Sequence, residues 1–241
     1  MILEICASNY QSAINAQKAG AHRIELCTEL AVGGLTPSFG LLKEVLKSLT
    51  IPVFVLIRPR SGNFTYTESE FEIMKQDIKL CKELGCKGIV SGVLNPDFTI
   101  DKKRTKELID ISSPLDFTFH RAFDWTPNPI LALATLIALK VKRVLTSGQQ
   151  PSAFDGFELL NKLKLHAKEN IIILPGGGID YKNAQSFKLG NFKELHASAT
   201  KIKSVNDQPI IPMNSDKFYD ETIEIVSDKT LIKNLLNSIK L

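Results

Sequence analysis

Short apolar segments alternate with longer amphipathic segments along most of the chain. Several of the short segments, such as 52–57 and 171–175, are apolar almost throughout, which is typical of parallel strands buried on both faces. The longer segments carry helix signals. Gly20 follows the helical pattern at 10–19, and the letters TESE at 67–70 form a capping-box pattern before 68–84. The pattern predicts strands and helices in regular alternation.

Eight strand-and-helix repeats are predicted. The predicted strands are 2–6, 22–27, 52–58, 87–93, 115–121, 143–147, 171–175 and 193–198. The predicted helices are 10–19, 39–48, 68–84, 102–111, 129–139, 153–168, 181–188 and 229–240. Such repeats close naturally into a (β/α)₈ TIM barrel, and 241 residues suit one domain of this α/β class. An open doubly wound sheet is the alternative, but no GxGxxG follows the first strand, so no nucleotide cofactor is expected.

The C-terminal part of the chain departs from the repeat. The barrel core is expected to span 1–203, and 204–241 is expected to form an irregular arm and a final helix that packs on the barrel. The arm is polar apart from a short apolar patch at 222–226. Connections of this length often serve as lids or contact arms.

Composition and charge exclude several classes of protein. The net charge of +4 is scattered, without the Lys/Arg block typical of nucleic-acid binding. No apolar run approaches the roughly 18 residues of a membrane span, and the chain opens on a strand rather than a signal peptide. Four cysteines without a CxxC pair are too sparse for a disulfide scaffold. These features favour a reduced, cytoplasmic protein with no nucleic-acid or membrane partner.

The first two predicted strands both end in Glu-x-Cys. Glu4 and Cys6 share one face of their strand, as do Glu25 and Cys27, because side chains alternate along a strand. If these faces point into the barrel, two carboxylates lie one layer below two thiols. Two thiols suggest a site for a soft metal such as Cu(I), although two cysteines are too few for a closed zinc site. A free cysteine is also often just a small buried hydrophobic residue.

Other strand ends carry acid/base chemistry. Functional groups of a barrel gather at the carboxyl ends of its strands, where His120 and Asp124 lie in the stretch TFHRAFD. Together with Glu25, they are candidates for general acid/base catalysis, whereas a hydrogen-bonded core histidine is the simpler alternative. No lysine ends a predicted strand, which disfavours a Schiff-base aldolase.

A glycine-rich loop is a candidate anion site. Gly176, Gly177 and Gly178 follow the seventh predicted strand, and their backbone N–H groups can approach an anion closely. Barrels commonly bind phosphate here and after the eighth strand, where Ser198 lies, and Ser147 after the sixth strand adds a further donor. A tight turn that needs only glycine flexibility is the alternative.

Two arginines follow the third predicted strand. Arg58 and Arg60 suit a carboxylate or phosphate as bidentate donors. Alternatively, they form ion pairs with Glu4 or Glu25.

Seven motifs together resemble the CutC family of copper homeostasis proteins. The motifs are RIELC, GGLTPS, IRPRSGNF, TFHRAFD, RVLTSGQ, LPGGGI and ELHASA, and they span residues 2 to about 200. The sequence departs from the family pattern at Ser61, where a glycine is usual. The resemblance implies a (β/α)₈ barrel in the cytoplasm, a homo-oligomer (expected to be a dimer), and Cu(I) bound by Cys6 and Cys27.

Two functions are therefore expected. The first is a Cu(I)-binding protein of copper homeostasis. The alternative is an enzyme acting on a small anionic or phosphorylated metabolite at the carboxyl face of the barrel. In that case His120, Glu25 and Asp124 would move protons, while the arginines and the glycine loop would hold the anion.

Overall fold

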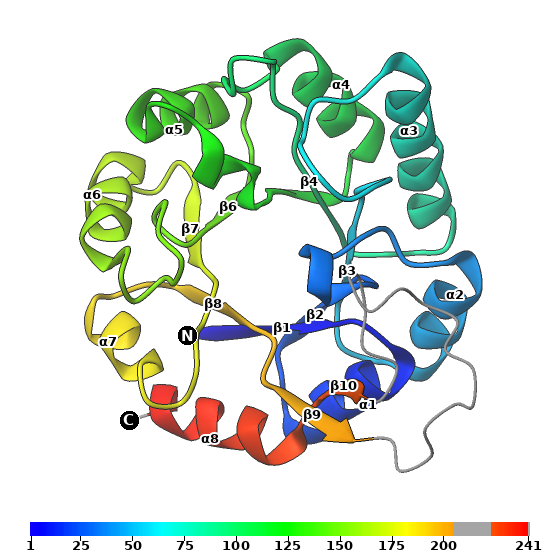
Figure 1. Cartoon of the computed structure of the whole chain (residues 1–241), viewed down its shortest axis with the longest axis vertical. Coiled ribbons are helices and arrows are strands. Elements are labelled where there is room, and N and C mark those ends of the chain that lie inside the picture. The colour runs from blue at the N-terminus through cyan, green and yellow to red at the C-terminus, as the bar shows by residue number, and fades with distance from the viewer. Residues whose placement is uncertain (205–222, 241) are drawn as a thin grey trace.

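The computed structural model describes residues 1–204 and 223–240. Its main sheet has eight parallel strands in the order β7-β6-β5-β4-β3-β2-β1-β8. A parallel bridge between Gly176 and His196 joins β7 to β8, so the sheet curls into a nearly closed barrel with helices around the outside (Figure 1). The predicted (β/α)₈ architecture is confirmed.

Every predicted strand and helix is present, with small shifts at the ends. The barrel strands are β1 (Ile2–Ala7), β2 (Arg23–Leu26), β3 (Val53–Leu56), β4 (Gly88–Ser91), β5 (Asp116–Phe119), β6 (Arg143–Thr146), β7 (Ile172–Pro175) and β8 (Glu194–Ala197). The helices are α1 (Tyr10–Ala19), α2 (Phe39–Ser48), α3 (Glu68–Glu83), α4 (Lys102–Ser112), α5 (Pro129–Ala138), α6 (Phe157–Ala167), α7 (Ala184–Leu189) and α8 (Lys229–Lys240). Two 3₁₀ turns, η1 (Leu30–Val32) and η2 (Arg121–Trp125), follow β2 and β5.

Local signals explain where several helices begin and end. Thr67 and Glu70 form the predicted capping box at the start of α3, each side chain bonding to the other residue's backbone N–H. Gly20 ends α1 with φ of 95°, a left-handed conformation that glycine adopts without strain. Helix α6 begins later than predicted, and its N-cap residue Gly156 packs tightly against the backbone at Ser147 and Gly148.

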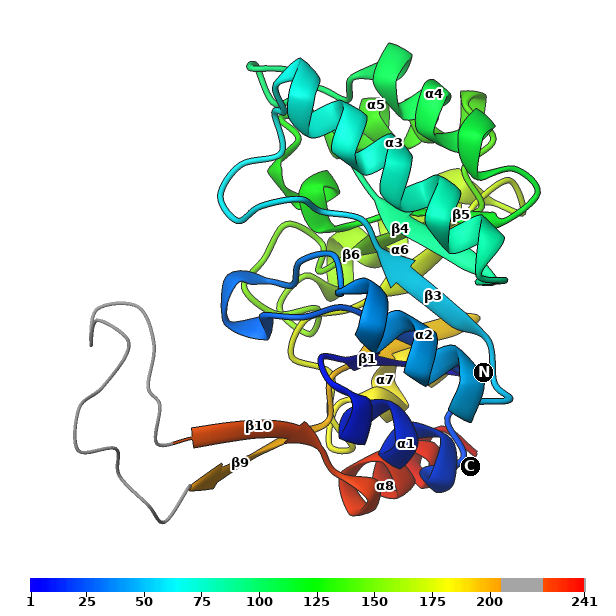
Figure 2. The same cartoon turned by 90° about the vertical axis from the view of Figure 1, so that its right-hand side faces the viewer.

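Within the described residues, the chain after β8 forms two more strands before helix α8. Strand β9 (Thr200–Ser204) pairs antiparallel with β10 (Ile223–Ser227), and the pair extends away from the barrel on the side of the loop after β2 (Figure 2). The sequence pattern indicated an irregular arm here, because pairing across a long connection leaves little local signal. The boundary expected at residue 203 falls inside β9, and the rest of the arm, 205–222, lies outside the described residues.

Helix α8 completes the outer ring of the barrel. It lies beside α1 and α7 in Figure 1 and contacts both. One face of it is buried through Ile232, Leu235, Leu236 and Ile239. Within 1–204 and 223–240, no helix is long and apolar enough to cross a membrane.

The barrel interior holds a buried ionic cluster below the carboxyl ends of the strands. Arg23 of β2 forms ion pairs with Glu4 of β1 and Glu194 of β8. Nε of Arg143 lies 3.2 Å from Glu194, and the two guanidinium groups lie 4.9 and 5.0 Å from the ring centre of Phe54. Buried charges need such partners, because desolvation costs several kcal/mol for each ion. The interior is thus strongly ionic at mid-height.

Removing the central cation should destabilise the fold strongly. Arg23→Gln removes the buried cation that Glu4 and Glu194 share, so the free energy of unfolding should fall by about 3–5 kcal/mol. Lys106→Gln, which breaks an exposed pair with Asp110, serves as the control and should cost less than about 1 kcal/mol. Urea denaturation at neutral pH measures both values. Equal small losses would show that the ionic cluster does not govern stability.

Candidate functional site

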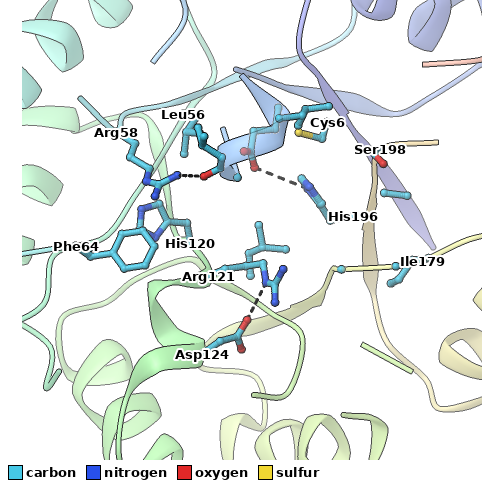
Figure 3. Close-up of a pocket in the computed structure, with 18 of the residues that line it drawn as sticks. Cys6, Leu56, Arg58, Phe64, His120, Arg121, Asp124, Ile179, His196 and Ser198 are labelled. Carbon is cyan, nitrogen blue, oxygen red and sulfur yellow. Dashed lines mark hydrogen bonds and ion pairs between the residues drawn. The ribbon is translucent and has the colours of Figure 1, made fainter. Parts of the chain in front are cut away.

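The carboxyl ends of the strands enclose a cavity of about 380 Å³ (Figure 3). Its lining comes from every barrel strand except β4, or from the loop that follows the strand. The predicted site residues that line it are Cys6, Glu25, Arg58, His120, Asp124, Gly177, Gly178 and Ser198. The barrel thus brings together residues that lie almost two hundred positions apart in the sequence.

Four predicted site residues do not line this cavity. Cys27 is fully buried beside Cys6. Arg60 points elsewhere and pairs with Glu70, the capping residue of α3. The Ser147 hydroxyl donates to a backbone carbonyl in its own loop. The backbone of Gly176 pairs with His196 in the β-bridge that closes the barrel.

The two thiols of the Glu-x-Cys repeat lie side by side. Sγ of Cys6 and Sγ of Cys27 are 3.5 Å apart. Strand register sets this arrangement, because Cys6 pairs with Glu25 and is therefore one layer below Cys27. The hydrogen bond between Cys6 and Cys27, together with burial, raises the pKa of Cys6 well above its usual range. Cys6 borders the cavity, whereas the loop that contains Gly34 covers Cys27.

His196 connects the thiols to two buried carboxyl groups. Its Nδ1 lies 2.8 Å from Oε1 of Glu4 and 3.8 Å from Oε2 of Glu25. Burial lowers the pKa of His196, but contacts with Cys6, Glu4 and Glu25 outweigh burial and raise it overall. These acidic partners thus favour the protonated form of the imidazole.

The two carboxyl groups behave differently. Burial acts to raise the pKa of Glu4, but Arg23 and His196 outweigh it and lower the pKa to about 2. Burial raises the pKa of Glu25 to about 7, because His196 offsets it only in part. Oε2 of Glu25 has no hydrogen-bond partner within the described residues. Glu4 is a permanent charge, whereas Glu25 is a buried carboxyl group that faces the cavity.

Glu4, Glu25 and His196 are also a possible set of metal ligands. Each offers one ligand atom, and these atoms lie within 4.8 Å of one another. A mixed set of carboxylate and imidazole ligands suits divalent cations rather than Cu(I). However, Glu4 is already committed to Arg23 and His196.

His120 presents a single free donor to the cavity. Its Nδ1 accepts the backbone N–H of Ala122 at 3.2 Å, so the neutral ring carries its proton on Nε2. Burial, reinforced by the charge of Arg58, lowers the pKa of His120 to about 3. The ring lies 4.9 Å from that of Phe64 and directly over Gly92, where a Cβ would come within 2.7 Å of it. Nε2 is buried and has no partner within the described residues.

Asp124 is fully occupied by donors. It accepts hydrogen bonds from the hydroxyl of Thr146, from the backbone N–H of Ser147 at 3.1 Å, and from the backbone N–H of Gln149 at 3.2 Å. Nε of Arg121 donates to it at 2.8 Å. This carboxylate fixes the loop after β6 and orients Arg121, so its geometry suits a positioning role better than proton transfer.

Arg58 is similarly occupied at its two terminal nitrogens, whereas its buried Nε has no partner within the described residues. Its Nη1 donates to the carbonyls of Val32 at 2.7 Å and Gly34 at 2.9 Å, and its Nη2 donates to that of Gly62 at 2.9 Å. These bonds hold the loop after β2 against the cavity. Neither Arg58 nor Arg60 pairs with Glu4 or Glu25, which was the alternative left open by the sequence.

Two residues that are central to the cavity, His196 and Arg121, were not predicted as site residues from the sequence. His196 shares the inward face of β8 with Ser198, so strand alternation alone could have identified it. Arg121 was harder to place, because the predicted strand ran through it. Strand β5 instead ends at Phe119, and η2 begins at Arg121, which brings this side chain to the cavity.

The family comparison agrees with this arrangement. A model of the CutC family matches residues 1–201. The chain belongs to the CutC family. The copper homeostasis protein cutC homolog of Homo sapiens is 48% identical over 199 residues, which cover 82% of this chain and 73% of that protein. The family protein CutC of Photorhabdus laumondii is 46% identical over 200 residues, covering 83% and 80% of the two chains.

Solved structures support the same relationship. A CutC crystal structure from Streptococcus agalactiae matches this CutC family member with a TM-score of 0.78 and 34% identity, over 82% of this chain and 98% of that one. Thiamine phosphate pyrophosphorylase from Pyrococcus furiosus matches with a TM-score of 0.61 and 12% identity, over 99% and 95% of the chains. The second likeness shows the fold alone. The resemblance stated from the motifs is confirmed.

The raised pKa of Glu25 predicts a pH-dependent stability. Between its ordinary value of 4.5 and about 7, the folded protein retains a proton that the unfolded chain has lost, so stability falls as pH rises through this window. Glu25→Gln cannot ionise. Relative to the natural protein, the variant should therefore gain up to about 3 kcal/mol in its free energy of unfolding between pH 4 and pH 8.

Urea denaturation across this pH range measures that difference. Glu44→Gln, on the exposed face of α2, is the control and should follow the natural protein at every pH. A constant difference between Glu25→Gln and the natural protein would contradict the buried, protonated state of Glu25.

Proposed function

We propose that this CutC family member binds one Cu(I) ion as cargo at Cys6 and Cys27. The main support is the pair of buried thiols 3.5 Å apart. Thiolates are soft ligands that select Cu(I). Relatives in Homo sapiens and Mus musculus, each 48% identical over 199 residues, are named copper homeostasis protein cutC homologs.

The surroundings of the thiols suit a protected soft-metal site. Cys6 and Cys27 belong to an apolar cluster with Phe54, Leu56 and Val90, which excludes water. The cavity provides an entry path to Cys6, and His196 beside it can serve as a further ligand once its second ring nitrogen releases a proton to the incoming metal. We place this function in the cytoplasm, because reducing conditions keep both thiols free. The expected homo-oligomer stays a prediction.

A Cu(I) titration tests this function. Under anaerobic, reducing conditions and against a competing chelator, the protein should bind one equivalent tightly. In the double variant Cys6→Ser and Cys27→Ser, the affinity should fall by more than about 100-fold, since losing both direct ligands exceeds the usual effect of losing one outer-shell partner.

The other two cysteines provide the matched control. Cys81 and Cys86 are also buried and free, but they lie at the end of α3, away from the cavity. The double variant Cys81→Ser and Cys86→Ser should bind Cu(I) as the natural protein does. Equal losses in the two double variants would remove the case for a specific site.

One observation favours a second candidate function, an enzyme that acts by acid/base chemistry. Oε2 of Glu25 and Nε2 of His120 both belong to cavity-lining residues, and both atoms are buried without a partner in the described part of the chain. An unpartnered buried polar group costs about 1–3 kcal/mol, and such groups persist where they serve a ligand or a reaction. Copper carriage by the thiols needs neither group.

We assign different roles to these two groups. Glu25 would accept a proton from a bound substrate. His120 would donate a hydrogen bond through Nε2–H to an oxygen on which negative charge develops. Asp124 would position Arg121 without touching the substrate. The expected substrate is a small anionic or phosphorylated metabolite.

Turnover of a panel of phosphorylated and carboxylated metabolites, followed by NMR, tests this candidate. Glu25→Gln and His120→Gln should each slow a reaction found in this way by about 10²–10⁴-fold. His166→Gln changes a histidine on the exposed face of α6 and should leave the rate unchanged. The candidate fails if the natural protein consumes none of the metabolites, or if all three variants react alike.

A further inference from the structure

One nitrogen of the Arg121 guanidinium group lies beside the glycine loop after β7 and makes no hydrogen bond within the described residues. Its Nε donates to Asp124 and its Nη2 donates to Ser147, each at 2.8 Å, which fixes the guanidinium plane. The remaining nitrogen, Nη1, has no hydrogen-bond partner in 1–204 or 223–240. Figure 3 shows Arg121 and Asp124 across the cavity from Cys6 and His196. This nitrogen is therefore separate from the thiols.

The backbone at Gly177 runs directly against this guanidinium group. A Cβ placed on Gly177 would lie 3.4 Å from Nη1 of Arg121 and 3.3 Å from Cβ of Ser147. The φ of Gly177 is 110° and that of Gly178 is 67°, values that other residues adopt only with strain. Glycine at both positions lets the peptide groups line the cavity without side chains between them and Arg121.

The hydrogen bonds that hold this loop use its carbonyl groups rather than its N–H groups. The carbonyl of Gly177 accepts the N–H of Ala153 at 2.8 Å, and that of Gly178 accepts Nδ2 of Asn183 at 2.8 Å. These bonds hold the loop in place. No hydrogen bond among the described residues uses the backbone N–H of Gly177 or Gly178, so both remain available to a ligand.

His120 adds an independent observation on the same cavity. Only 5% of its surface is exposed, and its Nε2 is a buried donor without a described partner. The unused groups of Arg121, the glycine loop and His120 are therefore all donors: a guanidinium nitrogen, two amides and an imidazole N–H. Such a set recognises an anion with several acceptor oxygens.

We propose that this side of the cavity binds the phosphoryl group of a small metabolite. Nη1 of Arg121 and the amides of Gly177 and Gly178 would contact the phosphoryl oxygens. Donors converging from three groups match three oxygens better than the two of a carboxylate. The loops after the seventh and eighth strands are also where TIM barrels commonly bind phosphate.

The rest of the cavity sets the character of the ligand. Asp124 does not repel the anion strongly, since Arg121 and several hydrogen-bond donors offset its charge. Leu145 and Ile179 give the cavity apolar walls, and Phe64 packs edge-on against Trp125 at 4.9 Å beside it. The metabolite therefore has a small, partly apolar body. The inference rests on the second candidate function only for the reaction of the bound metabolite, not for its binding.

Titration of inorganic phosphate into the ¹⁵N-labelled, metal-free full chain tests the proposal. The amide resonances of Gly177 and Gly178 should shift saturably and with one common dissociation constant. Sodium chloride at matched ionic strength should not reproduce these shifts. Arg121→Gln should weaken phosphate binding at least about tenfold, because it removes a charge-assisted hydrogen bond.

Arg60→Gln is the matched control, because Arg60 also pairs with a carboxylate but lies outside the cavity. It should bind phosphate like the natural protein. The shifts in the natural protein decide the question even if Arg121→Gln fails to fold. Unmoved glycine amides, or shifts that chloride reproduces, overturn the proposal.

The outcome is separable from both proposed functions. Phosphate should bind equally well to the double variant Cys6→Ser and Cys27→Ser, which lacks the copper ligands. Phosphate binding without turnover of any metabolite would overturn the acid/base candidate and leave the phosphate site standing. Turnover that depends on His120, with no phosphate response at the glycine amides, would overturn the phosphate site alone.

Discussion

The ion pairs of Arg23 with Glu4 and Glu194 inside the barrel are the interaction on which the rest of the structure depends. They tie β1, β2 and β8 together at mid-height. They also keep Glu4 charged, with its pKa near 2, although it is completely buried. That charge holds His196 by its Nδ1, and His196 in turn lies against Cys6 and Glu25. The floor of the cavity is thus a consequence of charges that stabilise the barrel.

The cavity above this floor has two chemically different sides. One side carries soft and acidic groups, namely Cys6 with Cys27 behind it, His196 and Glu25. The other side carries hydrogen-bond donors on Arg121 and the glycine loop. A soft cation and an oxyanion prefer opposite sides for simple electrostatic reasons. The copper and metabolite proposals therefore do not compete for the same atoms.

Several polar residues at the strand ends serve the scaffold rather than a ligand. Asp124 and Arg58 both border the cavity, yet hydrogen bonds to neighbouring loops already use most of their capacity. Because buried polar groups need partners, a loop that crosses the mouth of a barrel must be held by side chains of this kind. Unpartnered buried atoms of cavity-lining residues in the described part of the chain, such as Oε2 of Glu25 and Nε2 of His120, are better guides to function than the number of charges.

The sequence by itself determined the fold class, the family and most of the element boundaries. Apolar alternation and helix caps are local signals, so the eight repeats and the capping box of Thr67 and Glu70 could be read directly. Strand alternation also predicted the inward face that carries Cys6 and Glu25. The pairing of β9 with β10 escaped prediction, because it joins segments separated by a long connection.

Only the tertiary structure decided which strand-end residues share the cavity and which of their atoms are free. The register between β1 and β2 set Cys6 opposite Glu25 and brought its thiol to Cys27. A 3₁₀ turn brought Arg121 to the cavity, whereas the start of α3 drew Arg60 away to Glu70. Long side chains end several ångströms from their backbone, so their partners depend on neighbouring strands and loops that local sequence does not specify.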